Sequence, residues 1–207
     1  MKVTTVVVGM LEENCYIVSG EKSSVVIDPG DDADVIIHET NKIALPVSHI
    51  LLTHGHADHI GAAEEVRKRT GALLCVSEKD EEMLYSGQKN LSAFMNEDIK
   101  TEAADIVLKE GMIIKSDDLA INVIETPGHT MGGICFICGD SIFSGDTIFE
   151  NSIGRTDFPG GSFEKLQDSI KSKLYSLSGD YKIYPGHGNA TTLEHEKNSN
   201  AFVRCDR

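Results

Sequence analysis

The sequence predicts an α+β fold in which two β-sheets pack together and helices cover their outer sides. Three features support this prediction: β-rich runs at the amino terminus, a switch to alternating strands and helices after them, and a second half that repeats this order. A sheet must bury one face against another layer, so strands followed by helices twice over favour two packed sheets with helices outside. At 207 residues the chain is long enough for one core, and we expect residues 1–207 to form a single domain.

The first half of the chain is expected to begin as an antiparallel meander. Its three β-rich runs are separated by Gly9 and by a Gly-Glu-Lys turn, and the third stops at an Asp-Pro-Gly segment that opens a helix. A later helix ends before Gly71, which stands where a left-handed C-terminal cap is common. In chain order, the predicted elements are strands Val3–Val8, Cys15–Ser19 and Ser24–Ile27, helix Ala33–Thr40, strand His49–Leu52, helix Asp58–Thr70, strand Ala72–Val76 and helix Glu78–Tyr85.

The second half starts with residues 86–104, the least regular stretch, which we predict to be a loop or a lid. One later helix has Ser162 as its N-cap and Gly179 after its end, and the Thr191–Glu194 segment resembles a capping box. The predicted elements are strands Ile106–Leu108, Ile113–Lys115, Ala120–Thr126, Ile134–Ile137 and Ser141–Ser144, helix Phe163–Leu177, strand Lys182–Tyr184 and a short terminal helix entered through Thr191–Glu194.

Charge and hydropathy argue against some classes of partner. The formal net charge of −14 would repel a phosphate backbone, so we expect no nucleic-acid partner. No apolar run approaches the length of a transmembrane helix, and the Val-rich amino terminus lacks the features of a signal peptide. We therefore expect no membrane partner and a cytoplasmic location.

The cysteines are scattered, and most lie in apolar, strand-like segments. Their odd number favours reduced core thiols over a disulfide framework. Cys135 and Cys138 have C-x-x-C spacing, but side chains three apart in a strand point to opposite faces, so we do not expect a metal or redox pair there. The predicted free thiols are Cys15, Cys75, Cys135, Cys138 and Cys205.

The segment Thr53–His59, with the sequence THGHADH, carries the strongest functional signal. It follows a buried apolar strand and leads into a helix. In an extended chain His54 and His56 project to the same side, so both imidazoles can reach one metal ion, while Asp58 and His59 can reach a neighbouring one. The alternative is a polar strand end with solvated histidines, but ligand-type residues at this spacing favour metal binding.

Three later segments each place a ligand-type residue beside glycine at a predicted strand end: Pro-Gly-His129, Ser-Gly-Asp146 and Pro-Gly-His187. Glycine lets the backbone pass close to a crowded site. Each segment alone would indicate only a turn, but with the first segment they supply seven ligands, enough for two metal ions with open positions for water and substrate. The histidines outside every motif, expected to be structural or surface residues, are His38, His49 and His195.

In this chain order, the motifs H-x-H-x-D-H, G-H-T, G-D and G-H resemble those of the metallo-β-lactamase superfamily, and the resemblance spans essentially the whole chain. It implies an αββα sandwich, two mixed β-sheets flanked by helices, with two metal ions at one edge of the sheets. It also implies how the ligands divide: His54, His56 and His129 for the first metal, Asp58, His59 and His187 for the second, and Asp146 bridging both.

The resemblance implies a metal-dependent hydrolase that acts through a metal-bound hydroxide. Bound divalent metals lower the pKa of water to about 7, and Asp58 would be the catalytic carboxylate that orients the hydroxide. Zinc is the default expectation for both ions, but histidine and carboxylate ligands also accept iron and manganese. Asp28 is expected to be either a carboxylate that orients a ligand histidine or a turn former and helix cap.

Within the superfamily, the sequence most resembles the glyoxalase II-like group. The residues that carry this resemblance are Asn14-Cys15-Tyr16, Val26–Gly30, the histidine-rich segment and Pro185–Gly188. It implies hydrolysis of a small-molecule thioester such as acyl-glutathione. Glyoxalase II has a helical carboxy-terminal domain that helps to grip glutathione, whereas this chain ends soon after His187, so we expect a short form without that grip.

The segment Gly154–Phe158, with the sequence GRTDF, also departs from glyoxalase II, which has aromatic residues directly after the arginine. Arg155 is therefore expected either to bind a substrate carboxylate or to form a salt bridge with Asp157. The same segment resembles persulfide dioxygenases, which are iron enzymes of this fold, and an iron-dependent persulfide dioxygenase is the alternative function. The following Pro159–Ser162 resembles short glyoxalase II-like hydrolases and favours the hydrolase.

Two other activities of the superfamily are less compatible with the sequence. RNA processing is disfavoured by the acidic charge, and a true β-lactamase by Asp146 at the bridging position in place of cysteine and by the missing export signal. The natural acyl group, the thiol carrier and the oligomeric state are left open by the sequence.

Overall fold

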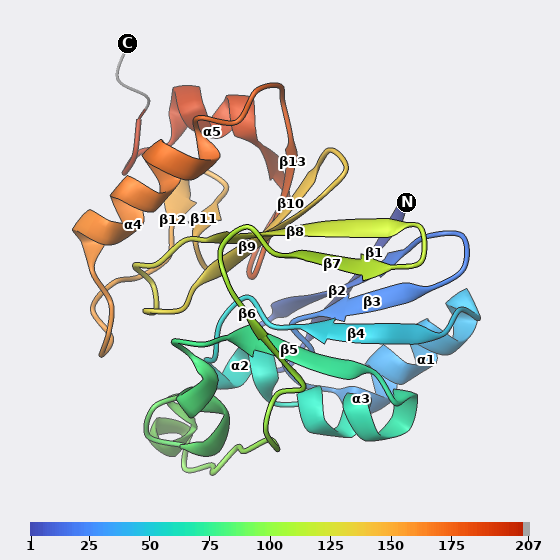
Figure 1. Cartoon of the computed structure of the whole chain (residues 1–207). Coiled ribbons are helices and arrows are strands. Elements are labelled where there is room, and N and C mark those ends of the chain that lie inside the picture. The colour runs from blue at the N-terminus through green and yellow to red at the C-terminus, as the bar shows by residue number, and fades with distance from the viewer. Residues whose placement is uncertain (205–207) are drawn as a thin grey trace.

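The computed structural model describes residues 1–204 and places them in four layers, with two six-stranded sheets between helices (Figure 1). Helices α1 (Ala33–Ile43) and α3 (Ala63–Thr70) pack on the outer face of the first sheet. Helices α4 (Phe163–Ser169) and α5 (Leu193–Ser199) pack on the outer face of the second. The predicted sandwich of two mixed sheets flanked by helices is confirmed.

The first sheet begins with the expected antiparallel meander and continues with parallel strands. Short Val- and Ile-rich runs form its strands because β-branched side chains pack well on a pleated surface. Its strands, in both chain and spatial order, are β1 (Lys2–Val8), β2 (Glu13–Ser19), β3 (Ser24–Ile27), β4 (Val47–Leu51), β5 (Leu73–Ser77) and β6 (Ile106–Leu108).

The second sheet is also mixed, because β10 (Ser141–Gly145) pairs in parallel with β13 (Lys182–Pro185) and antiparallel with β9 (Ile134–Cys138). A separate two-stranded hairpin of β11 (Ile148–Phe149) and β12 (Ser152–Ile153) was not predicted from the sequence, nor was the two-residue β14. In spatial order the strands of the second sheet are β14 (Thr191–Thr192), β13 (Lys182–Pro185), β10 (Ser141–Gly145), β9 (Ile134–Cys138), β8 (Leu119–Glu125) and β7 (Ile113–Ser116).

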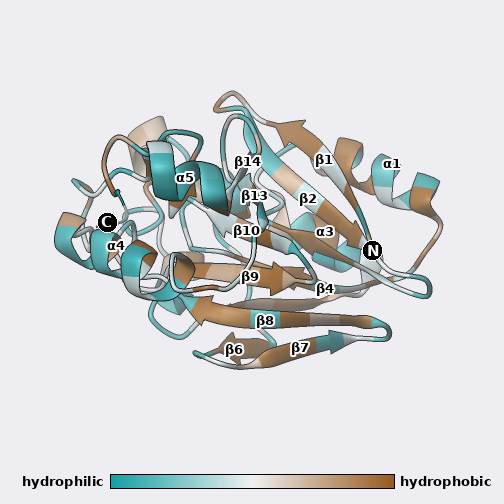
Figure 2. Cartoon of the chain, turned by 90° about the horizontal axis from the view of Figure 1, so that it is seen from above, coloured by the Kyte–Doolittle hydropathy of each residue, from teal (hydrophilic) through white to brown (hydrophobic). Residues whose placement is uncertain are grey.

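The core between the sheets is apolar, and the strands that enclose it are coloured mainly as hydrophobic in Figure 2. Phe136 and Phe143 are its largest fully buried side chains. Cys138 faces this core while Cys135 faces the cluster under α4, so the two thiols lie on opposite faces of β9, as predicted. Within residues 1–204 all cysteines are buried free thiols, and Cys205 lies outside the described residues.

The single helix predicted over Asp58–Thr70 is wrong. The structure has two helices, α2 (Ala57–Ile60) and α3, separated at Gly61. The Ala62 N–H leaves the helical ladder and donates to the Pro29 carbonyl at 2.9 Å. A Cβ atom at Gly61 would lie 2.3 Å from the Gly30 carbonyl oxygen, so the close approach of the residue 29–30 turn breaks the helix and requires glycine.

Two other predicted helices are shorter than expected. The Glu78–Tyr85 helix is only a 3-10 turn, η1 (Glu81–Tyr85). The Phe163–Leu177 helix is α-helical to Ser169 and continues as a π-helical turn, η3 (Ile170–Leu174). The wider turn keeps buried Ile170 and Leu174 facing the second sheet. The irregular stretch 86–104 is confirmed as a loop, with one short 3-10 turn, η2 (Ser92–Met95).

None of the helices among residues 1–204 combines the length and hydropathy needed to cross a bilayer.

Replacing Phe136 with alanine tests the core between the sheets. Because the side chain is fully buried, we expect Phe136→Ala to lower the free energy of unfolding by about 3–5 kcal/mol. The matched control is Ile113→Ala on β7, where the side chain is 51% exposed and the change should stay within about 0.5 kcal/mol. Chemical denaturation monitored by circular dichroism measures both; equal effects of the two variants would contradict the assigned core.

Candidate metal centre

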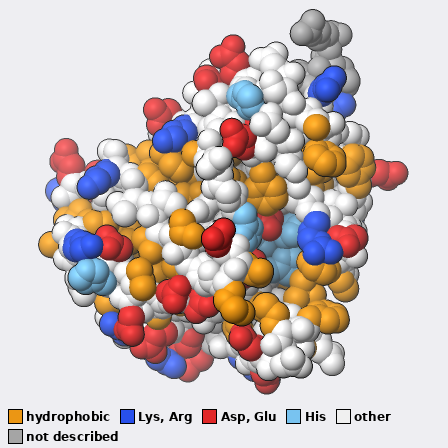
Figure 3. Space-filling model, turned by 180° about the vertical axis from the view of Figure 1, so that it is seen from behind, with side chains coloured by type: hydrophobic (Ala, Val, Ile, Leu, Met, Phe, Trp, Pro, Cys, Tyr) orange, Lys and Arg blue, Asp and Glu red, His pale blue; other side chains and the backbone are white. Residues whose placement is uncertain are grey.

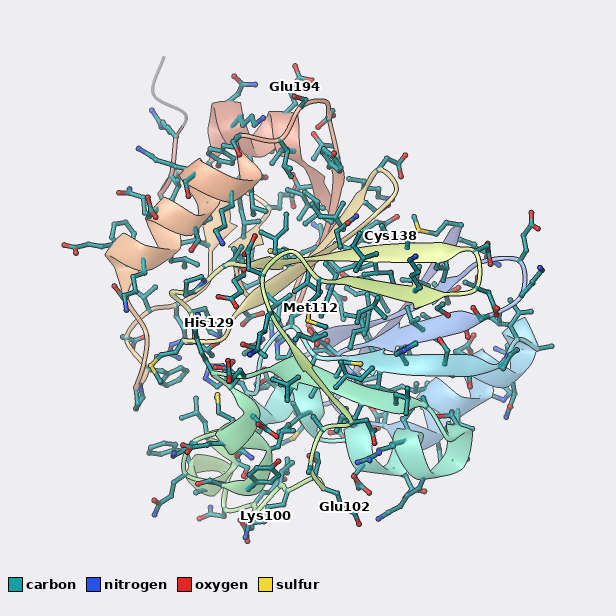
Figure 4. The ribbon with its side chains drawn as sticks, viewed as in Figure 1. Lys100, Glu102, Met112, His129, Cys138 and Glu194 are labelled. Carbon is teal, nitrogen blue, oxygen red and sulfur yellow. The ribbon has the colours of Figure 1, made fainter. Side chains whose placement is uncertain are left out.

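The ligand-type residues gather at one edge of the sandwich, where strands of both sheets end. His54 follows β4, His129 follows β8, Asp146 follows β10 and His187 follows β13. In Figure 4, His129 lies at the end of the sheets where the green 81–95 segment is also found. A Cβ atom at Gly186 would lie 2.4 Å from Asp146 Oδ1, so the chain passes this edge closely enough to require glycine.

The first group of candidate ligands contains His54, His56 and His129, whose ligand atoms lie within 4.8 Å of one another. All three side chains are buried, and His56 Nδ1 is 2.9 Å from His129 Nε2. Burial, with the nearby His129, lowers the pKa of His56 to about 3. The imidazole is therefore neutral at pH 7, which is the form that binds a metal.

The second group contains Asp58, His59 and His187, whose ligand atoms also lie within 4.8 Å of one another. The Asp58 carboxylate oxygen Oδ2 is 3.3 Å from His187 Nε2 and 3.9 Å from His59 Nε2. Burial alone would lower the pKa of His59, but the carboxylates of Asp146 and Asp58 raise it well above its usual range. The negative field of this group therefore favours a cation.

Asp146 lies between the two groups and faces both. Its Oδ2 atom is 3.5 Å from His129 Nε2 in the first group, and its Oδ1 atom is 3.4 Å from His59 Nε2 and 3.9 Å from His187 Nε2 in the second. The Asp146 carboxylate is therefore close to both groups, as a bridging ligand must be.

Atoms without hydrogen-bond partners show that the residues fit a pair of metal ions. His54 Nε2, His59 Nε2 and Asp146 Oδ1 are buried and lack a hydrogen-bond partner. Leaving such a group unsatisfied costs about 1–3 kcal/mol. Imidazole nitrogens and a carboxylate oxygen converging on one space match the donor set of zinc, iron and other divalent metals.

The nitrogens that face away from the centre are anchored by hydrogen bonds. His129 Nδ1 donates to the backbone carbonyl of Arg155 at 2.7 Å, and His187 Nδ1 donates to that of Leu11 at 3.0 Å. His59 Nδ1 donates to Asp28 Oδ2 at 3.0 Å. These contacts set the ring orientations and leave the opposite nitrogens directed at the centre, an arrangement common among metal-binding histidines.

Asp28 stands beside the centre, at the end of β3. Its carboxylate accepts hydrogen bonds from the Thr53 N–H at 2.7 Å and the Thr53 hydroxyl at 2.5 Å, in addition to the one from His59. The residue that precedes α1 as its cap is Asp32. Asp28 therefore contacts His59, a candidate ligand, and does not occupy the cap position of α1.

The Arg155 side chain forms a bidentate salt bridge with Asp157, with distances of 2.8 and 2.7 Å. Its guanidinium carbon also lies 3.7 Å from the centroid of the Phe158 ring. Hydrogen bonding to Arg155 lowers the pKa of Asp157 to about 2, so the pair is ionised at neutral pH. Of the two alternatives expected for Arg155, the salt bridge is present, and the side chain also lines the cleft described below.

Asp80 was missed by the sequence analysis. Its buried carboxylate accepts hydrogen bonds from the Thr130 hydroxyl at 2.6 Å, the Gly132 N–H at 2.8 Å and the Gly55 N–H at 3.2 Å. It thus ties the loop between His54 and His56 to the loop after His129. The sequence did contain a signal, because Asp80 is a carboxylate a few residues after the end of a predicted strand. It also lies within the helix expected at Glu78–Tyr85, so no role at the site was assigned to it.

Glu13 was missed as well, although it directly precedes the Asn14-Cys15-Tyr16 segment. Its carboxylate is buried, lacks a hydrogen-bond partner and lies 3.7 Å from His59 Nδ1. Burial raises the pKa of Glu13 well above its usual range.

The histidines expected to be structural or surface residues contact other partners or solvent: His49 contacts Ser48, His195 contacts Asn151, and His38 is exposed.

A cleft of about 590 Å³ lies over the centre. Figure 3, which shows the molecule from behind, has histidine side chains at the bottom of a hollow with hydrophobic side chains beside it. The cleft is large enough for a small molecule and combines apolar walls with a few polar groups, as ligand sites commonly do. Its lining includes Asp58, Asp146, His56, His129, His187, Leu11, Leu91, Phe94, Met95, Phe149, Phe158 and Arg155.

Comparisons with known proteins agree with this geometry. A family model described as the metallo-beta-lactamase superfamily matches residues 8–187. A hydroxyacylglutathione hydrolase, GloC, from Haemophilus influenzae is 35% identical to this chain, and the alignment covers 98% of each sequence.

Solved structures with the same fold include the BLEG-1 B3 metallo-beta-lactamase, with a TM-score of 0.93, 31% identity and coverage of 98% of this chain and 99% of that one. TTHA1623 in a di-iron-bound form has a TM-score of 0.87 and 33% identity, and 97% of this chain and 100% of that one are covered. ETHE1 from Myxococcus xanthus has a TM-score of 0.84 and 28% identity, and 98% and 84% are covered.

Asp80→Asn tests whether this carboxylate positions the candidate ligands. The amide keeps the size of the side chain but cannot accept all three hydrogen bonds, so we expect metal affinity to fall about 10- to 100-fold. Competition with a chromogenic chelator measures the affinity. The control is Asp140→Asn in the exposed turn between β9 and β10, which should leave it unchanged. Unaltered metal affinity in folded Asp80→Asn protein would contradict this role.

Proposed function

Because the chain belongs to the metallo-β-lactamase superfamily, we propose that it is a metal-dependent hydrolase of thioesters such as acyl-glutathione. The observation that carries the proposal is the pair of ligand groups joined by Asp146 at the bottom of a cleft that fits a small molecule. The likeness to a relative named as a hydroxyacylglutathione hydrolase supports thioesters as the substrate class.

In this proposal two divalent metal ions, with zinc as the default, occupy the centre. His54, His56 and His129 would hold the first, Asp58, His59 and His187 would hold the second, and Asp146 would contact both. When bound, such metals lower the pKa of water to about 7, which supplies a nucleophile at neutral pH, and they polarise the carbonyl that is attacked. Iron and manganese suit the same ligands, and the di-iron-bound relative supports iron as a real alternative.

Asp58 is the proposed catalytic carboxylate. It lines the cleft, and its side chain is 22% exposed, so it meets substrate and water. Burial alone would raise the pKa of Asp58, but His59 and His187 hold it below its usual value, so the group is ionised at neutral pH. It accepts a hydrogen bond from the attacking water and orients it. A thiol leaving group with a pKa of about 8.5 needs little help from a general acid.

Arg155 is the proposed contact for a carboxylate of the substrate. Asp157 and Phe158 hold the guanidinium in place at the cleft, and its side chain remains 56% exposed. A fixed guanidinium loses little conformational freedom when it binds a carboxylate.

An iron-dependent persulfide dioxygenase is the second candidate. The Gly154–Phe158 segment, whose sequence resembles those enzymes, lines the cleft through Arg155 and Phe158. The structural likeness to ETHE1 and to a di-iron-bound protein also favours it. The hydrolase is preferred because the named hydrolase relative is more similar in sequence than ETHE1 and is matched over nearly its whole length.

Hydrolysis of S-lactoylglutathione by metal-loaded protein tests the proposal, followed by the loss of thioester absorbance. We expect kcat/KM on the order of 10⁴ M⁻¹s⁻¹ or higher, in the range of enzymes acting on their own substrates. Asp58→Ala should abolish the activity because it removes both a ligand and the group that orients water, while Asp140→Ala should match the unmodified protein. Absence of hydrolysis together with oxygen uptake on glutathione persulfide would replace the hydrolase with the dioxygenase.

Removal and return of metal test the cofactor. Dialysis against a chelator should abolish hydrolysis, and zinc should restore it with saturation at two ions per chain, measured by elemental analysis and activity together. His59→Ala should lower the stoichiometry because it removes a ligand of the second group. Full activity at one ion per chain would contradict a two-metal mechanism.

A further inference from the structure

The cleft has two chemically different ends, each adjoining one group of ligands. Leu11 accepts the hydrogen bond from His187 through its backbone carbonyl and therefore lies beside the second group. Arg155 accepts the hydrogen bond from His129 in the same way and lies beside the first group, where Phe158 packs 5.8 Å from His56, measured between ring centroids. One end is thus marked by an aliphatic side chain and the other by a cation.

The loop that carries η2 adds apolar side chains to the end marked by Leu11. The Asn90 carbonyl accepts a hydrogen bond from the Ala57 N–H at 2.8 Å, and a neighbouring hollow is lined by Leu11, Asp58 and Met95 together, which places the loop beside Leu11 and the second group. Leu91, Phe94 and Met95 follow and line the cleft.

This loop is held in a strained, well-anchored conformation. Leu91 and Asn96, which flank η2, have φ angles of 72° and 61°, a region that costs energy for a residue other than glycine. The fully buried Asn90 side chain donates to the carbonyls of Met83 and Ile99 and accepts from the Ser92 N–H. These bonds stabilise a conformation that presents Phe94 and Met95 to the cleft.

The side chains presented in this way are unusually exposed for their size. Phe94 is 78% exposed, Leu11 is 55% exposed and Met95 is 40% exposed, and all three line the same cleft. Anchored apolar side chains around a concave site gain free energy when a ligand covers them.

The charges of the cleft determine which part of a substrate this apolar end accepts. Among the described residues that line the cleft, Arg155 is the only lysine or arginine, and the carboxylates are those of Asp58 and Asp146. Asp157 engages Arg155 through Nε and Nη2 but does not line the cleft, so the remaining N–H donors of the guanidinium favour a carboxylate-bearing thiol at this end. The uncharged acyl part of the thioester would then lie at the other end of the cleft, beside Asp58 and His187.

Building on the proposed thioesterase function, we propose that Leu11, Leu91, Phe94 and Met95 form an acyl subsite that selects thioesters with extended apolar acyl groups over those with small polar ones such as lactoyl. The thiol part of the substrate extends toward Arg155, and the scissile carbonyl lies between the two ends, over Asp146.

Binding of two thioethers that cannot be hydrolysed tests the subsite independently of catalysis. S-hexylglutathione and S-methylglutathione share the thiol and differ only in the group that would occupy the apolar end. Calorimetric titration of the metal-loaded protein should give an affinity at least tenfold higher for the hexyl compound, since each buried methylene contributes about fourfold. Equal affinities would overturn the proposal.

Substitutions assign the preference to the named residues. Phe94→Ser should reduce the tenfold preference to less than threefold and leave the affinity for S-methylglutathione unchanged. Leu11→Ser, from a different loop, should act in the same direction. The matched control is Phe202→Ser, because Phe202 is 52% exposed and lies outside the cleft lining. Retention of the full preference in both cleft variants would overturn the assignment.

The same assay with cleavable substrates separates this inference from the proposed function. S-hexanoylglutathione should be hydrolysed with a kcat/KM at least tenfold higher than S-lactoylglutathione, and Phe94→Ser should remove the difference. Hydrolysis of neither thioester, with the preference for the hexyl thioether intact, would reject the thioesterase and keep the apolar subsite. Hydrolysis of both at equal kcat/KM, without a preference for the hexyl thioether, would keep the thioesterase and reject the subsite.

Discussion

The convergence of histidines and carboxylates on Asp146 is the constraint on which the rest of the structure depends. Burying ionisable groups away from water is costly unless they are paired or bind a metal, and here several buried atoms of the candidate ligands lack a hydrogen-bond partner. The fold confines that cost to one edge, where strands of both sheets end, while the space between the sheets is filled by apolar side chains. A stable core and a polar centre therefore coexist because they occupy different parts of the sandwich.

The orientation of the ligands depends on a layer of contacts around them. Asp28 and Asp80 anchor segments from the first half of the chain, and the carbonyls of Leu11 and Arg155 anchor histidines from the second half. The same two carbonyls belong to residues whose side chains line the cleft. The residues that orient two of the candidate ligands are thus the same residues whose side chains line the cleft.

The candidate ligands alone do not select one reaction, because a pair of metal ions at this centre would suit hydrolysis and iron chemistry alike. Selection must come from the cleft. Its apolar end is built by the loop after β1 and the longer loop after η1, and its charged end by the loop after β12. Such loops vary without disturbing the sheets, which is how one scaffold serves different substrates.

The sequence alone determined the two-sheet architecture and the segments that contain every candidate ligand, because strand periodicity and the spacing of histidine, aspartate and glycine are local properties. It did not reveal the break at Gly61, the role of Asp80 or the apolar end of the cleft. Each of these depends on contacts between distant residues: Gly61 with Gly30, Asp80 with Thr130 and Gly132, and Leu11 with His187. Only the tertiary structure brings such residues together, so only it determined how the site is supported and what its cleft can bind.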